Sequence, residues 1–386
     1  MAAPSHRHQS SLEGVFDFST NEPLFTSDQQ RAQVVGRFRR IVDYFEAAEL
    51  QQPQASSSKP GDGYNRPALI RLTFEYARSQ ESQDRLLSAF FKALDLEMFG
   101  DSVGLSDDTV VADFRSALFG FADYLVTHFF LPLQASTNKT PQLSPIYPAA
   151  DQPREGQHTQ EIVETPERLS VLRGSCLVRD RHRCVITQAF DRKVLKQRLR
   201  HPPAKDDDGN PLDGRNQYGG LEVAHILPNT LTKEGDGELR KHESRKAAIA
   251  IMDMLDVGVI HLIEGNDINQ PRNALILSLE MHQAFGQFEV FFEPIADEPP
   301  HSYRIDSFYP FSDRLPVTRT LFMHPSIDPP SERLLALHSA IGHILHLSGA
   351  GDYIEVLLRD MEDGFVREDG STELGVLVNL ALQIKG

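Results

Sequence analysis

Two histidines and an asparagine occur in segments whose patterns predict a small β-β-α unit. His225 lies near the end of the alternating run Leu221–Pro228, which predicts a strand because alternate residues share one face. Asn273 precedes a second short apolar run. His282 follows in the segment 278–286, where a serine could cap a helix and a glycine could end it. Imidazole exchanges protons near physiological pH and binds metals, so these residues are suited to hydrolytic chemistry.

The order of strand, asparagine, strand and histidine-bearing helix resembles the HNH endonuclease family, whose active unit is called ββα-metal. The likeness is to the AHI…N…H variant of fungal-type HNH nuclease domain proteins, and its parts here are Ala224-His225-Ile226, Asn273 and His282. Upstream, Cys184–Thr187 looks like the opening strand of that variant. Downstream, the likeness extends through Phe288–Pro294 and, more loosely, through the leucine- and histidine-rich segment 331–349.

The resemblance implies a role for each residue of the motif. His225 would be the general base that deprotonates water, and His282 would bind one divalent metal ion, Mg²⁺ or similar. Asn273 would hold the hairpin loop and orient His225 through a hydrogen bond. The expected activity is metal-dependent hydrolysis of phosphodiester bonds in nucleic acid, with DNA as the expected partner and no membrane.

One position departs from the family pattern. The residue before the base is usually an Asp or His that supplies a metal ligand, and here it is Ala224. Glu222 shares a strand face with Ala224 and is the candidate replacement, although two residues along a strand cover ~6.6 Å. The insertion 229–272, with an expected helix near 240–255, contributes further acids: Asp253, Asp256, Glu264 and Asp267. The departure leaves a second function open, a catalytically inactive HNH scaffold that binds nucleic acid or protein.

A basic segment lies directly upstream of the motif. Residues 168–200 contain ten Lys or Arg and two acids, a formal charge of +8 in a chain whose net charge is −16. Backbone phosphates attract such a segment without any readout of sequence, and a solvated helix face would have the same composition. The residues expected to contact nucleic acid are Arg179, Arg181, Arg183, Arg192, Lys193 and Lys196.

The whole chain has the composition of a globular intracellular protein. Its 386 residues are 40% hydrophobic and 24% charged, which suits two or three domains. The first 23 residues lack the apolar core of a signal peptide, and no run approaches the roughly 18 apolar residues of a membrane span. The two cysteines, Cys176 and Cys184, cannot make a disulfide scaffold and match no common zinc spacing. An intracellular location is expected, with nucleus and cytoplasm both open.

Periodicity and turn residues divide the chain into five regions. We predict a disordered tail at 1–23, a helical region at 24–131, a linker at 132–166, an HNH nuclease-like domain at 167–296 and a helical C-terminal extension at 297–386 that packs on that domain. The predicted fold class is α+β, with short antiparallel strands in the central domain. Helices are expected at 24–48, 66–79, 81–98, 107–130, 331–349 and 352–363.

Other polar groups have structural interpretations. His338, His343 and His346 lie in a strongly apolar helical pattern, where a core or surface role outweighs a metal site. The run Asp206–Asp208 precedes a glycine and lacks the other positions of a calcium loop, so it is typical of a solvated turn.

Overall fold

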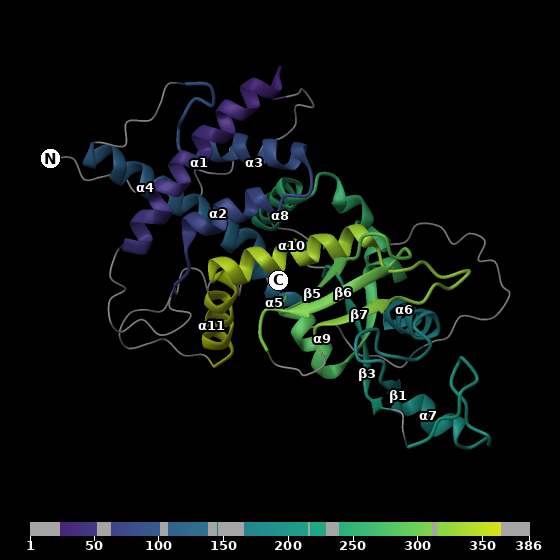
Figure 1. Ribbon diagram of the computed structural model, residues 1–386. Helices are drawn as coiled ribbons and strands as arrows, with labels where there is room; N and C mark the ends of the chain where they lie inside the picture. The colour runs from purple at the N-terminus through teal and green to yellow at the C-terminus, as the bar shows by residue number, and fades with distance from the viewer. Residues whose placement is uncertain are drawn as a thin grey trace. The chain divides into compact units, whose positions relative to one another are not determined.

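The computed structural model describes residues 24–51, 63–100, 107–137, 145, 166–214, 217–228, 239–310 and 315–363. The chain divides into two compact units, whose elements are labelled in Figure 1. Unit 1 takes in Met1–Leu133, Gly235–Ile260 and His343–Gly386, and unit 2 takes in Gln134–Glu234 and His261–Gly342. The predicted tail at 1–23 and most of the predicted linker at 132–166 lie outside the described residues.

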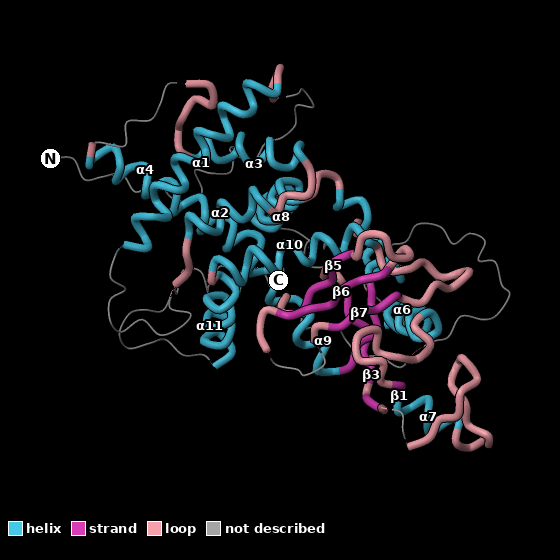
Figure 2. The backbone as a smooth tube through the Cα atoms, viewed as in Figure 1, coloured by secondary structure: helices cyan, strands magenta, loops and turns pink. Residues whose placement is uncertain are grey.

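The described part of unit 1 is helical (Figure 2). Its elements are α1 (Asp28–Gln51), α2 (Arg66–Glu75), α3 (Gln80–Ala93), α4 (Asp108–Leu125), the π-helical turn Val126–Phe130, the start of α5 (Leu131–Thr137), α8 (Leu239–Leu255) and α11 (Ala350–Asp363). The side chains of Asn65, Ser79 and Asp107 accept backbone N–H bonds in the first turns of α2, α3 and α4. These caps satisfy N–H groups that a helix start leaves unpaired, so the helices begin close to where the sequence predicts.

Phenylalanine side chains from several helices build the core of unit 1. The ring centroid of Phe90 lies 4.9 Å from that of Phe38 and 6.1 Å from that of Phe121, both edge to face. The continuous helical run Asp108–Ser136 is long and apolar enough to cross a membrane, but 61% of its most apolar window is buried inside the structure. Packing within the unit therefore accounts for the apolar character of this run.

Unit 2 mixes helices with short strands. Its elements are α6 (Pro166–Arg179), β1 (Phe190–Asp191), α7 (Arg192–Arg198), β2 (Tyr218–Gly219), β3 (Leu221–His225), β4 (Ala274–Ser278), α9 (Leu279–Gly286), β5 (Val290–Pro294), β6 (Ser302–Ser307), β7 (Val317–Thr320) and the first part of α10 (Glu332–Ser348). Strands β3 and β4 pair antiparallel, β5-β6-β7 form an antiparallel sheet, and β1 pairs parallel with β2. The fold class is α+β, as the sequence predicts.

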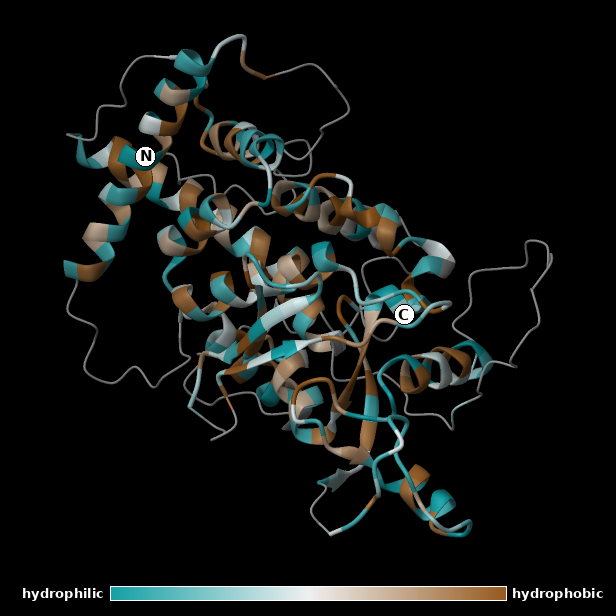
Figure 3. Cartoon of the chain, turned by 45° about the vertical axis from the view of Figure 1, so that its right-hand side comes forward, coloured by the Kyte–Doolittle hydropathy of each residue, from teal (hydrophilic) through white to brown (hydrophobic). Residues whose placement is uncertain are grey.

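The β3–β4 hairpin and α9 form the β-β-α unit. Leu221 pairs with Ser278 and His225 with Ala274, so the two strands match over their full length. The hairpin is largely hydrophobic (Figure 3) because it is covered on both faces, with α9 packed against both strands and α6 also in contact with them. The predicted strand, strand and helix at these positions are confirmed.

Helix α10 holds α9 in place through a stacked histidine. The ring of His338 lies 3.8 Å from that of Phe285 and 4.5 Å from that of Phe288, both stacked. Its Nε2 donates to the Phe285 carbonyl at 3.0 Å. A Cβ at Gly342 would come within 2.9 Å of the Phe288 carbonyl oxygen, so this close approach requires glycine. His338 is a core residue, as the sequence interpretation held.

Several predicted boundaries differ from the structure. Cys184–Thr187 forms a turn and not a strand: the Gln188 N–H bonds the Cys184 carbonyl at 2.9 Å, and the apolar side chains are buried by packing. Helix α5 extends into the start of the predicted linker. The C-terminal extension 297–386 is not wholly helical, since β6 and β7 lie within it. Helix α8, predicted within the central domain, belongs to unit 1, where it packs against α2, α3 and the π-helical turn Val126–Phe130.

Candidate functional site

His225 ends strand β3 and is held by a neighbour from the loop before β4. Its Nε2 lies 3.0 Å from Oδ1 of Asn269, at the end of the 3₁₀ turn Gly265–Asn269. An amide oxygen only accepts hydrogen bonds, so Nε2 carries the proton and the lone pair of the neutral ring is on Nδ1. The half-buried imidazole is thus fixed in orientation and in tautomer.

Asn273 is fully buried and binds backbone groups. Its Oδ1 accepts from the Leu227 N–H at 3.0 Å, and its Nδ2 donates to the carbonyls of Leu227 and Ile268 at 2.9 and 3.0 Å. These bonds hold the chain that follows His225 against the loop that precedes β4. The prediction that Asn273 orients His225 by a hydrogen bond is corrected, because the side chain that bonds the ring is Asn269.

Glu222 and His282 contact each other directly. The Oε2 atom of Glu222 lies 2.6 Å from Nδ1 of His282, and their side chains are 23% and 10% exposed. Glu222 reaches α9 from strand β3, and His282 is the fourth residue of α9. The pair joins an oxygen donor and a nitrogen donor in a partly buried place next to the hairpin.

The two imidazoles are positioned from two places on β3. Glu222 and His225 are three positions apart, which separates their Cα atoms by ~10 Å along the strand. His282 contacts Glu222, and Asn269 bonds His225. Strand geometry gives the site two parts: a fixed imidazole at the strand end, and a carboxylate–imidazole pair under α9.

Arg179 is buried beneath the hairpin, which corrects its prediction as a nucleic-acid contact. The side chain is 0% exposed and makes two bonds to the Asp180 carboxylate, at 2.7 and 2.9 Å. It also donates to the carbonyls of Pro271 and Ala274, which flank Asn273, at 2.6 and 2.8 Å. Asp180 in turn accepts from the Ile276 N–H at 3.1 Å. The pair fixes the course of the chain through Asn273, and no phosphate reaches it.

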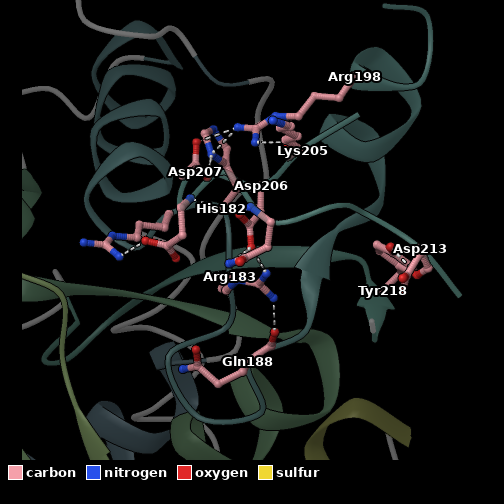
Figure 4. Close-up of polar contacts among 12 residues, drawn as sticks. His182, Arg183, Gln188, Arg198, Lys205, Asp206, Asp207, Asp213 and Tyr218 are labelled. Carbon is pink, nitrogen blue, oxygen red and sulfur yellow. Dashed lines mark hydrogen bonds and ion pairs between the residues drawn. The ribbon is translucent and has the colours of Figure 1, made fainter. Parts of the chain in front are cut away.

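Arg181 and Arg183 are paired with acids of the loop that follows α7. Arg181 bonds Asp208, and Arg183 bonds Asp206 at 2.8 Å. The intervening His182 lies 2.8 Å from Asp207, so the basic run 181–183 meets the acidic run 206–208 in reverse order. Figure 4 shows the part of this contact around His182 and Arg183. Their charges are neutralised internally, unlike the predicted role in phosphate binding.

The remaining predicted contacts lie on α7. Arg192, Lys193 and Lys196 are all exposed, and within the described residues no ion pair involves them. They are the part of the predicted basic surface that faces solvent.

The acids of the insertion have other partners. Asp253 belongs to unit 1, where it pairs with Arg85 at 2.7 Å. In unit 2, Asp267 pairs with Arg272 at 2.9 Å, and Glu264 lies 3.5 Å from the exposed ring of His261. Throughout the described ranges, no group of three or more His, Cys, Asp or Glu side chains is placed to hold a metal. Next to the hairpin, Glu222 and His282 are a carboxylate and an imidazole in direct contact.

Cys176 is a buried residue of α6. Burial raises the pKa of its thiol to about 12, so the group stays protonated. A nucleophilic role for this cysteine is excluded at neutral pH.

Comparison with protein families agrees with this geometry. Residues 184–293 match the model of a family described as HNH endonuclease. The match begins in the turn after Arg183 and ends in β5, so it contains the hairpin, α9 and every residue of the two-part site. This segment, less than a third of the 386-residue chain, is therefore similar to HNH endonucleases. No curated protein and no solved structure gives a significant match.

Sequence reasoning missed two site residues. Asn269 lies within the predicted insertion, 44 positions from His225, and nothing in its local pattern marks it. In the sequence, Asp180 is one of two acids in the basic segment 168–200, and its position next to Arg179 does not indicate a buried ion pair. Its burial depends on contacts with residues more than 90 positions away, which a linear pattern does not contain.

Proposed function

We propose that this protein is a metal-dependent endonuclease that hydrolyses phosphodiester bonds of nucleic acid, with DNA as its substrate. The observation that carries the proposal is the imidazole of His225. Within the segment that matches the HNH endonuclease family, its ring is fixed at the strand end by Asn269. A general base needs the right geometry as well as a suitable pKa, and the hydrogen bond to Asn269 gives the His225 ring a defined orientation.

His225 would act as the general base. Its imidazole, oriented by the Nε2 bond to Asn269, takes a proton from water as the water oxygen bonds to phosphorus and the bond to the leaving oxygen breaks. The Asn269 carbonyl then stabilises the imidazolium through the same hydrogen bond. The leaving oxygen takes up a proton from solvent, which balances the reaction.

Glu222 and His282 fit a divalent metal as a two-donor set. Their donor atoms touch at 2.6 Å, and both can reach one cation because ligand distances are ~2 Å. Mg²⁺ is commonly held by one or two carboxylates and completes its shell with water and phosphate, so Glu222 would be its carboxylate ligand. When bound, such a metal would stabilise negative charge on the phosphate and on the leaving oxygen. The protein itself would supply two ligands to this metal, the side chains of Glu222 and His282.

A second function has its own supporting observation. Ala224 contributes no ligand, and the Glu222 carboxylate is engaged by His282. A pair that stays closed would leave an HNH scaffold that binds nucleic acid or protein without cleaving. Activity measurements separate this function from the first.

The test is nicking of supercoiled plasmid by the full chain with Mg²⁺ or Mn²⁺, and with EDTA as the blank. We expect nicking that needs the metal and that falls by about 10²–10⁴-fold in His225→Ala, the range for loss of a general base. His324→Ala is the matched control: this half-buried histidine bonds Ser326 through its ring and lies outside the two-part site, so the variant should nick normally. Nicking that survives in His225→Ala would refute the assigned base. DNA binding without nicking by the wild type would favour the inactive scaffold.

A further inference from the structure

Residues 190–214, here called the α7 arm, fold around a small core of their own within unit 2. Phe190, Val194 and Leu212 are buried together, and Leu195, Ala204 and Tyr218 pack against them. The Asp191 carboxylate caps α7 by accepting from the N–H groups of Lys193 and Val194 at 2.7 and 2.9 Å. The arm, which begins with β1 and continues through α7, is therefore a fixed platform (Figure 1).

One side of the α7 arm is locked by charge pairs. Asp207 accepts from Arg198 at 2.6 Å and lies 2.8 Å from His182. Burial alone would raise the pKa of Asp207, but these hydrogen bonds lower it to about 2, so the carboxylate stays charged. Arg198 also donates to the Lys205 carbonyl at 2.7 Å, which ties the loop to α7 (Figure 4). The acidic run 206–208 thus forms ion pairs with Arg181, Arg183 and Arg198.

The other side of the α7 arm carries cations that have no such partners. Residues 192–205 contain six Lys or Arg and no Asp or Glu. On α7, Arg192, Lys193 and Lys196 fall within an arc of about 100°, because each helical residue turns the chain by about 100°. Buried Val194 lies on the opposite side of the helix. Within the described part of the chain, these three cations and the exposed Lys205 form no ion pair.

A groove lies at the C-terminal end of α7. It has a volume of about 520 Å³, and its lining includes His201, Lys205 and the ion pair between Arg198 and Asp207. The volume falls within the range of small-molecule sites, and the groove is open to solvent. Of its basic side chains, Lys205 is exposed and forms no ion pair within the described residues, whereas Arg198 is paired with Asp207.

We propose that the α7 arm is the docking surface for the sugar–phosphate backbone of the nucleic-acid substrate. Arg192, Lys193 and Lys196 contact consecutive phosphates, and Lys205 holds a further phosphate over the groove. This assignment rests on the proposed nuclease function. The paired residues Arg181 and Arg183 hold the arm in place and contact no phosphate.

Charge explains why the chain needs such a platform. The protein carries a formal charge of −16, so its surface as a whole repels a polyanion. A local cluster of unpaired cations supplies attraction at one place only. Because phosphates are the same in every sequence, docking here positions the substrate and gives no sequence preference.

The test is binding of a fluorescent DNA duplex by the full chain in EDTA, followed by anisotropy over a range of salt concentrations. The arm variant is Arg192→Gln, Lys193→Gln and Lys196→Gln together. Its slope of log affinity against log salt should fall by about 2.7, since each phosphate contact to duplex DNA contributes about 0.9. Lys205→Gln alone should lower the slope by about 0.9. A thermal melt by circular dichroism should show that these exposed substitutions leave the fold intact.

The matched control removes the same charge elsewhere. Arg39→Gln, Arg40→Gln and Lys92→Gln together alter three exposed cations of α1 and α3 in unit 1, and the slope should stay at the wild-type value. Equal slopes for the arm variant and the wild type, or equal losses in arm and control variants, would overturn the docking proposal. So would equal binding of polyglutamate, since the surface would then be general for polyanions.

Nicking assays keep the two proposals separate. If the arm variant nicks DNA as the wild type does at near-physiological salt, and binds DNA equally well, the docking surface is rejected and the nuclease proposal stands. If the wild type binds DNA in a salt-sensitive way but never nicks it, and the arm variant loses this binding, the nuclease proposal is rejected and the docking surface stands. His225→Ala should bind DNA with the wild-type slope, because that side chain is not part of the arm.

Discussion

Replacing Arg179 by alanine should destabilise unit 2 and leave phosphate binding unchanged. The side chain is 0% exposed, and its loss would strand the buried Asp180 carboxylate. It would also remove donors from the carbonyls of Pro271 and Ala274. Removing one partner of a buried ion pair typically costs about 3–5 kcal/mol, against a total stability of roughly 5–15 kcal/mol for a domain. Unit 2 would lose a large part of its stability.

Hydrogen exchange measured by mass spectrometry on the full chain is the suitable assay, because two units need not unfold in one step. Amide protection in peptides covering 271–278 should fall by about 3 kcal/mol or more in Arg179→Ala. Arg179→Lys keeps the charge but loses the forked donor geometry, so it should recover only part of the loss. Arg192→Ala, an exposed position, should change protection by less than about 0.5 kcal/mol.

DNA binding distinguishes a structural role of Arg179 from the phosphate contact that the basic composition of its segment suggests. If Arg179 contacted a phosphate, Arg179→Ala would lower the salt slope by about 0.9 and spare the fold. We expect an unchanged slope in the folded fraction of the variant. Wild-type protection combined with a lower slope would refute the structural role.

Three further predictions concern single residues. Burial lowers the pKa of His338 to about 3, and the hydrogen bond to the Phe285 carbonyl opposes this shift in part. Below pH 6.5 the unfolded chain therefore binds a proton at this histidine that the folded chain does not bind. Stability should therefore fall as pH drops from about 6.5 towards 3, by about 2 kcal/mol at pH 5, and urea unfolding of His338→Gln at both pH values should lack this component. Asn269→Asp places a negative charge beside His225 and should move the acid limb of the nicking pH profile up by about 1–3 units; an unmoved limb would contradict the assigned contact. Asn273→Ala leaves three buried backbone groups unpaired and should reduce hydrogen-exchange protection of the hairpin by about 3 kcal/mol or more, a loss that unchanged exchange would disprove.

The sequence alone determined the local elements of the site and their order. Alternation over Leu221–Pro228 and the apolar run after Asn273 predicted the hairpin strands, and the segment 278–286 predicted the helix that carries His282. These signals are local, because strand and helix periodicity depend on neighbours within one or two turns. The resemblance to the HNH endonuclease family rests on the same residues, and the family match confirms it.

Only the tertiary structure decided what each polar side chain touches. Arg179 and Arg192 are the same residue type in one basic segment, yet one is buried against Asp180 and the other faces solvent. Asn269, and not Asn273, reaches His225, although both asparagines precede β4. Partners 44 to 95 positions apart are joined by the folded chain, and residue type sets a side chain's charge without setting its solvent exposure.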